Sequence, residues 1–266
     1  MIIDFHTHIF PDMIAEKSIA ALSKVSGIAA STNGTLQGLL DSMDKSGIDM
    51  SVIMPVVTKP SQFQTVKVFA QKVNETYGGR LLSFGGIHPD SENYKEELRI
   101  IKDLGLPGIK IHPDYQKVMI DDIRYMNIID YASELDLIIL THAGVDIGLP
   151  EPIHCTPQRL RKVLDIVKPE KFIAAHMGGW KLWEDVYEYL VGENVYLDTA
   201  FSMDYIEPDM FMKIWKAHDQ KKILFASDSP WGEVGKEVAA IKTLPISDVQ
   251  KADIFANNAK RLLSIT

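Results

Sequence analysis

Eight short apolar runs recur along the 266 residues of this chain, and their number and spacing constrain its fold more than any other feature. Most runs are almost continuously apolar rather than alternating between apolar and polar residues, which is typical of strands that are covered on both faces. They occupy 2–8, 49–56, 81–89, 108–113, 137–144, 172–179, 195–200 and 223–230. The pattern therefore predicts eight buried strands.

Amphipathic segments with helical spacing lie between most of these runs. They occupy 61–78, 91–105, 121–136, 156–167, 179–192, 208–218 and 247–265. In the segment 91–105, Ser91 fits a helix N-cap and Gly105 fits the residue that follows a helix. The last segment reads as a terminal helix, with room for a break near Asn257 and Asn258.

Strands that alternate with helices favour one parallel sheet with right-handed crossovers. Eight strands close a (β/α)₈ barrel, whose usual size is about 250 residues. A doubly wound open sheet is the alternative, but no Gly-x-Gly-x-x-Gly follows the first run, which weakens its dinucleotide-binding version. No linker, low-complexity segment or repeat divides the chain, so we expect a single (β/α)₈ TIM-barrel domain over 1–266.

The net charge and the cysteine content restrict which binding partners and which cellular compartment we expect for this protein. The formal net charge is −8, with no basic stripe, which argues against nucleic-acid binding. Cys155 is the single cysteine, so an intrachain disulfide is excluded and a reducing cytoplasm is expected. The first residues lack the features of a signal peptide, and no run approaches the roughly 20 apolar residues of a membrane span. We expect a soluble cytoplasmic protein that acts on a small molecule, and its pI of about 5.5 is compatible with a homodimer.

The first run contains "FHTH", in which His6 and His8 are two positions apart. Residues at i and i+2 of a strand share a face, with Cα atoms about 6.5–7 Å apart, so both imidazoles could converge on one ion. A strand that carries two histidines by chance is the simpler alternative, and the pair alone does not decide between them.

Further polar residues occupy the ends of other predicted strands: Lys110 and His112, His142, His176 and Asp228. In a barrel, the C-terminal ends of the strands form the active-site face, so these side chains would converge on one rim. Three imidazoles and one carboxylate would suit Zn²⁺ or a similar divalent ion with an open position for water.

Taken together, these motifs resemble the amidohydrolase superfamily of metal-dependent (β/α)₈-barrel enzymes. The similarity is strongest to the branch that contains small-substrate hydrolases and decarboxylases of the aminocarboxymuconate-semialdehyde and resorcylate type. It is based on "FHTH", "THAG", "AHMGG" and "FASDSPWG", which span residues 6–232 in the family's order.

The resemblance implies a role for each matching residue. His6, His8 and His142 would bind a divalent metal, most simply Zn²⁺, with Mn²⁺ or Fe²⁺ as alternatives. Asp228 would contact the metal or its water and act as the catalytic general base. His176 would be a catalytic histidine beside the metal rather than a required ligand.

Lys110 is the ambiguous position, because binuclear relatives carry a carboxylated lysine on the fourth strand. We expect an unmodified amine that binds a substrate carboxylate. His112, beside it at the same rim, is a further candidate for substrate binding, with a structural rim histidine as the alternative. His154 lies in the proline-rich "LPEPIHCTP" and is a candidate for substrate contact. Cys155 is expected to be a buried, inert thiol, and Trp231 is expected to form the floor of the pocket.

Three functions remain open from the sequence. The leading one is a metal-dependent hydrolase of a small amide, lactone or ester-like compound through a metal-activated water. The alternative is a metal-dependent non-oxidative decarboxylase of a small carboxylate, although few arginines lie near the strand ends to hold a dicarboxylate. A metal-binding barrel without turnover is disfavoured, because Asp228 supplies a base at the metal.

Overall fold

The computed structural model describes residues 1–149 and 151–265. Its strands are β1 (Ile3–Thr7), β2 (Met50–Ile53), β3 (Leu81–Ser83), β4 (Gly85–Gly86), β5 (Gly108–Ile111), β6 (Ile138–Thr141), β7 (Phe172–Ala174), β8 (Tyr196–Asp198) and β9 (Ile223–Leu224). Each lies within one of the eight predicted runs, and β3 and β4 share the third run.

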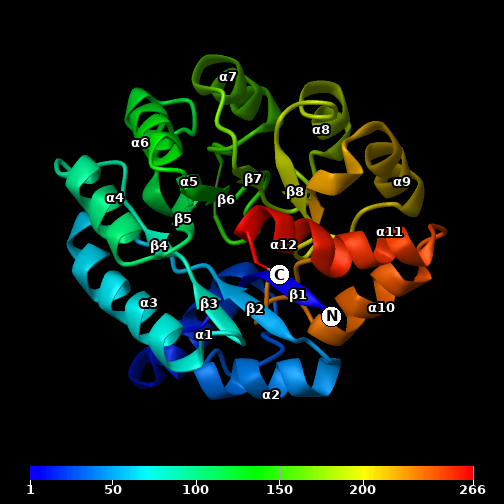
Figure 1. Cartoon of the computed structure of the whole chain (residues 1–266), viewed down its shortest axis with the longest axis horizontal. Coiled ribbons are helices and arrows are strands. Elements are labelled where there is room, and N and C mark those ends of the chain that lie inside the picture. The colour runs from blue at the N-terminus through cyan, green and yellow to red at the C-terminus, as the bar shows by residue number, and fades with distance from the viewer. Residues whose placement is uncertain (150, 266) are drawn as a thin grey trace.

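Helices follow the strands and form an outer ring around them (Figure 1). The α-helices are α1 (Asp12–Ser26), α2 (Leu36–Ser46), α3 (Phe63–Tyr77), α4 (Tyr94–Asp103), α5 (Pro113–Gln116), α6 (Ile123–Glu134), α7 (Pro157–Val167), α8 (Trp183–Tyr189), α9 (Pro208–Ala217), α10 (Val234–Thr243), α11 (Asp248–Ala252) and α12 (Asn258–Leu263). Short helical segments of other types are η1 (Pro60–Gln62), η2 (Gln220–Lys222) and the π-helix η3 (Asp253–Asn257).

Hydrogen bonds close the strands into a barrel. Parallel pairing runs from β1 to β3 and from β4 to β9, and β3 and β4 are two parts of one strand, in which the N–H of Phe84 donates to the carbonyl of Ile53. At the other seam, the N–H of Phe5 donates to the carbonyl of Phe225 at 3.0 Å, and the N–H of Asp228 donates to the carbonyl of His6 at 2.9 Å. The predicted (β/α)₈ barrel is confirmed.

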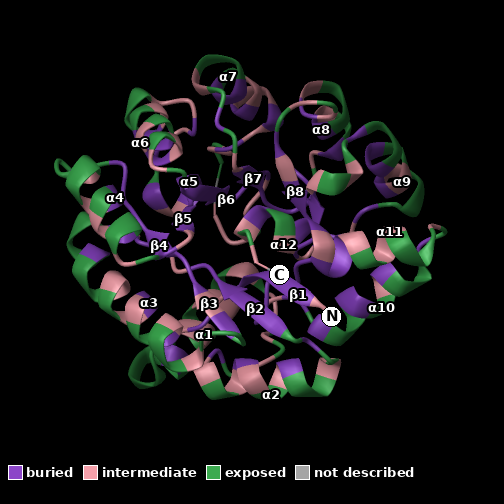
Figure 2. Cartoon of the chain, in the orientation of Figure 1, coloured by how far each residue is buried: buried purple, intermediate pink, exposed green. Residues whose placement is uncertain are grey.

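Two hydrophobic clusters lie on opposite sides of the barrel wall, because successive side chains of a strand face opposite ways. In β6, Ile138 and Leu140 belong to the inner cluster, whereas Ile139 belongs to the larger cluster beneath the helices. Figure 2 shows the result as buried strands surrounded by helices whose outer faces are exposed. Leu262 of α12 belongs to the inner cluster together with Ile3, and α12 contacts β9 while the preceding η3 contacts β1, so the C-terminal helical segment packs against the barrel strands.

A β-bulge in β1 orients the histidine motif. Asp4 pairs with Ser51 but Thr7 pairs with Ile53, so β1 advances one residue more than its partner. Phe5 consequently packs in the inner cluster while the next residue, His6, also reaches toward β8 inside the barrel. The bulge therefore positions the first candidate ligand.

Several local expectations need correction. Helix α4 begins after Asn93, so Ser91 is not its N-cap, whereas Gly105 has the expected positive φ of 69°. The C-terminal helix does not break near Asn257 and Asn258, because the π-helix η3 connects α11 to α12 without interruption. The sequence patterns did not predict α1, α2 or α10.

Among the described residues, no helix is both long enough and apolar enough to cross a membrane.

Candidate active site

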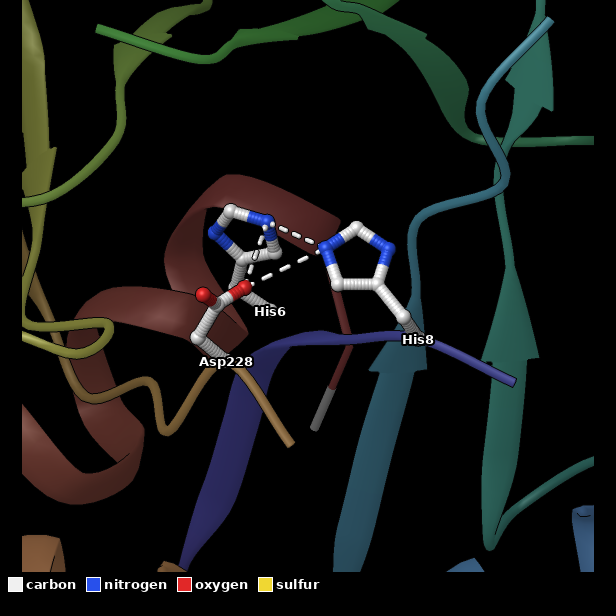
Figure 3. A group of neighbouring side chains, drawn as sticks. All are labelled: His6, His8 and Asp228. Carbon is white, nitrogen blue, oxygen red and sulfur yellow. Dashed lines mark hydrogen bonds and ion pairs between the residues drawn. The ribbon is translucent and has the colours of Figure 1, made fainter. Parts of the chain in front are cut away.

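His6, His8 and Asp228 meet at the C-terminal rim of the barrel, although Asp228 is far from the histidines in sequence (Figure 3). The Nε2 atoms of His6 and His8 are 3.1 Å apart. Oδ1 of Asp228 lies 3.2 Å from Nε2 of His8 and 3.6 Å from Nε2 of His6. These three predicted residues therefore present one ligand atom each to a common centre.

The partners of the outer ring nitrogens determine which nitrogens carry protons. Nδ1 of His8 lies 2.7 Å from the carbonyl of Met54, which can only accept a hydrogen bond, so Nδ1 is the donor. Nδ1 of His6 lies 3.0 Å from Oδ2 of Asp198 and donates to that carboxylate. In the neutral imidazoles, both Nε2 atoms are then lone pairs that face each other. Such facing acceptors fit a divalent cation between them, and outer partners of this kind orient metal-binding histidines.

Electrostatics favour an ionised Asp228. Burial alone would raise the pKa of its carboxyl group, but the neighbouring imidazoles of His8, His6 and His176 lower the pKa to about 2. Burial and the nearby charge of Lys110 keep the pKa of His6 well below its usual value, so that imidazole is neutral. An anionic oxygen and neutral imidazoles are the donor set that Zn²⁺ and related ions bind.

His176 and His142 form a second pair beside this centre. Nδ1 of His176 donates to the carbonyl of Ala200 at 2.8 Å, which leaves Nε2 as the lone pair. That Nε2 lies 3.1 Å from Nδ1 of His142, and the rings of His176 and His6 have centroids 5.5 Å apart. His142 thus lies next to the centre with His176 between it and His6, and its role as a ligand of the same ion stays a prediction.

The strand exits that carry these residues have constrained backbones. His176 and Asp228 both have φ of 60°, which L-residues other than Asn and Asp adopt at some cost. After His142, Gly144 has φ of 89°, and a Cβ there would lie 2.1 Å from the backbone nitrogen of Trp180. Glycine is required at this position because two barrel loops touch, and this contact fixes the chain that leaves β6.

Lys110 reaches the same centre from β5. Its Nζ lies 3.0 Å from Nε2 of His6, and the side chain is buried. Burial lowers the pKa of Lys110 to about 8, although the carboxylates of Asp228 and Asp198 act in the opposite direction. A buried amine beside the candidate metal ligands is consistent with the expected contact with a substrate carboxylate. The unmodified state of Lys110 stays a prediction.

His112 also lies at the rim, but its geometry differs from that of a metal ligand. Its Nδ1 accepts the backbone N–H of Tyr115, so Nε2 carries the proton and points at Oδ2 of Asp146, 3.5 Å away. The rings of His112 and His142 stack with an interplanar angle of 7° and centroids 4.3 Å apart. Two nearly parallel, stacked rings cannot place one ion in both ring planes. Although His112, His142 and Asp146 lie close enough to hold a metal, this arrangement suits contact with a substrate better.

The main cavity of about 640 Å³ opens above the candidate metal ligands His6, His8 and Asp228. His6, His8, Lys110, His142 and Asp228 lie at its base together with His112 and His176, and its wall is mostly apolar. Ile14 and Leu22 of α1 and Phe69 of α3 contribute to this wall, and Trp231 lines the cavity as expected. The site can therefore hold one polar group at the metal and an apolar body beyond it.

Other residues fall outside the expected places or were not predicted. His154 does not line the cavity in the part of the chain that the structure describes, and its Nδ1 is 2.9 Å from Oδ1 of Asp114 instead. Cys155 is fully buried, and burial raises the pKa of its thiol well above the usual value, as expected of an inert cysteine.

Sequence reasoning missed Asp198 and Asp114. The signal for Asp198 was available, because it ends the strand in "VYLDTA" just as Asp228 ends its own.

A sequence model of the amidohydrolase family matches residues 3–265. The chain therefore belongs to the amidohydrolase family, which confirms the resemblance noted in its motifs. A comparison with curated proteins finds no match.

Solved structures with the same fold extend over nearly the whole chain. An uncharacterized TIM-barrel protein from Bordetella bronchiseptica has a TM-score of 0.80 at 17% identity, covering 99% of this chain and 98% of its own. A 2,6-dihydroxybenzoate decarboxylase from Rhizobium has a TM-score of 0.71 at 15% identity, with 99% and 98% covered. A 5-carboxyvanillate decarboxylase from Novosphingobium aromaticivorans, in complex with manganese and 4-hydroxy-3-methoxy-5-nitrobenzoic acid, has a TM-score of 0.73 at 16% identity, with 100% and 96% covered. Identities this low establish the shared fold alone.

Proposed function

We propose that this amidohydrolase is a metal-dependent, non-oxidative decarboxylase of an aromatic acid that carries one carboxylate. The observation that carries the proposal is the cavity, whose polar base is formed by Lys110 and the candidate metal ligands His6, His8 and Asp228 and whose remaining wall is mostly apolar. A substrate carboxylate would lie at the base and the aromatic body would fill the apolar part. An apolar wall favours loss of CO₂, because it stabilises a neutral product relative to a carboxylate.

The structural neighbours support decarboxylation more than hydrolysis, which the sequence had favoured. Two of the three structures described above are decarboxylases of hydroxylated aromatic acids. Hydrolysis of an amide or lactone by the same cluster is the competing reaction and is an outcome of the test below.

Charge limits the substrate to one carboxylate. In the described residues, no arginine lines the cavity. Arg80, Arg124 and Arg159, the arginines nearest to the strand ends in sequence, form ion pairs elsewhere with Asp44, with Asp90 and Asp122, and with Asp121, respectively. Lys110 is the cationic side chain at the cavity base, and a second carboxylate would have no arginine partner there.

The residues of this chain have distinct roles in the proposed reaction. A divalent ion held by His6, His8 and Asp228, with His142 as a further predicted ligand, would supply positive charge to the substrate's oxygens. Lys110 Nζ would donate to the carboxylate and orient it. Ionised Asp228 would accept the proton of a substrate hydroxyl at a carboxylate oxygen and return a proton to the ring carbon as its bond to CO₂ breaks.

The test measures CO₂ release directly. Purified protein is stripped with a chelator, reloaded with Mn²⁺ or Zn²⁺, and incubated with carboxyl-¹³C-labelled monohydroxy- and dihydroxybenzoates, beside a matched panel of aryl lactones and anilides. We expect ¹³CO₂ and the corresponding phenol with the metal, and neither product from the chelated protein. Hydrolysis of a lactone or anilide without ¹³CO₂ release would instead identify a hydrolase.

A matched pair of lysine variants tests the proposed orientation. Lys110→Met removes the cation at the cavity base, and Lys236→Met removes an exposed lysine from α10 that pairs with Glu233. We expect Lys110→Met to lower kcat/KM by at least about tenfold, the scale of one hydrogen bond to a charged group. Equal activity of the two variants would exclude Lys110 from substrate binding.

The metal's identity, the location and the assembly are finer proposals. Zinc was the first expectation, but a neighbour with bound manganese supports testing Mn²⁺ equally. A cytoplasmic location, a small-molecule substrate and a homodimer stay predictions.

A further inference from the structure

Asp114 occupies a buried position directly behind the candidate metal centre. It lies in the short helix α5 that follows β5, and its side chain is 4% exposed. Oδ1 accepts two hydrogen bonds from His154, one from the backbone N–H at 3.1 Å and one from Nδ1 at 2.9 Å. His154 thus fixes the orientation of the carboxylate.

The other oxygen of this carboxylate faces His142, the further predicted metal ligand. Oδ2 of Asp114 lies 3.9 Å from Nε2 of His142. Both atoms are buried, and within residues 1–149 and 151–265 neither has a hydrogen-bond partner. Each unsatisfied buried polar group costs on the order of 1–3 kcal/mol, so a hydrogen bond between these two atoms would stabilise the folded protein.

Two placements of the single ring proton of His142 are available. With the proton on Nδ1, it donates to Nε2 of His176 at 3.1 Å, and Nε2 of His142 is left facing an acceptor oxygen. With the proton on Nε2, it can donate to Asp114, and Nδ1 becomes a lone pair on the side where His176 presents its own lone pair. The second placement leaves two facing lone pairs, which only a cation can satisfy.

We propose that Asp114 is a positioning residue that holds the proton of His142 on Nε2 and thereby directs the Nδ1 lone pair at the metal. In His6, His8 and His176 the ring proton is instead on Nδ1. These Nδ1 atoms donate to Asp198, Met54 and Ala200, respectively, so Nε2 carries the lone pair. The pair needs to approach by about 1 Å to reach ordinary hydrogen-bond length. The inference relies on the divalent metal centre of the proposed function and not on the reaction that this centre performs.

The first measurement uses the wild-type protein. Two-bond ¹H–¹⁵N correlation spectra of uniformly ¹⁵N-labelled protein distinguish the two histidine tautomers, and Zn²⁺ is the diamagnetic probe. We expect the ring of His142, assigned by comparison with His142→Gln, to carry its proton on Nε2 in the zinc-loaded protein. A proton on Nδ1 in that state, or a wild-type protein that binds no zinc, would overturn the proposal.

The second measurement is zinc affinity, obtained by competition with a chromophoric chelator. Asp114→Ala should weaken zinc binding by about 10–100-fold, the usual effect of removing the partner of a metal-binding histidine. Asp114→Asn should not restore the affinity, because its amide oxygen stays with the two donors of His154 and its NH₂ group then faces Nε2 of His142, where it favours the proton on Nδ1. Glu237→Gln is the matched control, since Glu237 is also buried with one unpartnered carboxylate oxygen in the described structure but does not line the main cavity.

The outcomes separate this inference from the proposed reaction. Wild-type zinc affinity in Asp114→Ala would refute the positioning role even if the protein decarboxylates benzoates. Failure to release CO₂ from every acid in the panel would refute the reaction and leave the tautomer and the affinities unaffected. If Asp114→Ala does not fold, which its thermal unfolding curve reveals, the wild-type tautomer and Asp114→Asn still decide the matter.

Discussion

Replacement of Asp228 by asparagine separates proton transfer from metal binding. The backbone at 228 has φ of 60°, a region that asparagine tolerates better than other non-glycine residues, so the turn after β9 should keep its shape. The amide is nearly isosteric with the carboxylate, and its oxygen can still face Nε2 of His8, 3.2 Å away in the wild type. We therefore expect a folded variant that keeps much of its metal.

The expected loss lies in turnover. The pKa of Asp228 is lowered to about 2, so at neutral pH the side chain is a carboxylate, which is the form that can accept a proton. An amide cannot accept that proton, and positioned general acid–base groups contribute about 10²–10⁴-fold. We expect kcat to fall by at least about 100-fold, which corresponds to roughly 2.7 kcal/mol of activation free energy.

The assay pairs kcat from initial rates of CO₂ release with metal content per chain by elemental analysis. Asp209→Asn, an exposed position at the start of α9, is the control for the substitution itself. A metal-loaded Asp228→Asn protein that turns over at a rate near that of the wild type would show that Asp228 is not the base. His176 would then be the next candidate, because its Nε2 is an available lone pair beside the centre.

Three further predictions concern the metal, the lysine and a buried acid. The double variant His6→Ala/His8→Ala should lose stoichiometric metal, because it removes two of the three converging ligand atoms; full retention in elemental analysis would exclude this site. Lys110 should appear as an unmodified amine in a high-resolution electron-density map, and a carboxylate on Nζ that bridges two metals would make the site binuclear. Burial and, secondarily, Asp204 raise the pKa of Glu237 well above its usual value, so the folded state binds more protons than the unfolded state and stability falls as pH rises above about 4.5. Glu237→Gln should therefore raise Tm at pH 7.5 by about 2–4 °C for each kcal/mol gained and change it little at pH 4, and a lower Tm at pH 7.5 would contradict this.

The barrel was predictable because its signal is local. Strands covered on both faces must be continuously apolar over several residues, as in 137–144, and parallel strands need a helix between them. The unpredicted helix α1 shows the limit of this reasoning. Among its described residues only Ala15 is buried, and the apolar residues Ile14 and Leu22 line a cavity rather than a core, so α1 lacks the buried stripe that marks a packed helix.

The convergence of His6, His8 and Asp228 was also determined by the sequence. Side chains two positions apart on a strand share a face, and the C-terminal ends of barrel strands meet at one rim, so strand-end positions were sufficient to bring these groups together. The same reasoning placed His142 and His176 beside them, as the structure has them.

Only the tertiary structure decided which ring nitrogen each histidine offers. That choice depends on the acceptor behind the ring, and these acceptors come from other strands: Asp198 is 192 positions from His6, and the carbonyl of Met54 is 46 positions from His8. The tertiary structure also pairs His154 with Asp114, whereas the sequence had suggested contact with a substrate. The side chains of a loop are oriented by contacts across space rather than by a repeating backbone period. The period of a strand determines which way a side chain points, whereas the proton on its ring is determined by neighbours that no local pattern encodes.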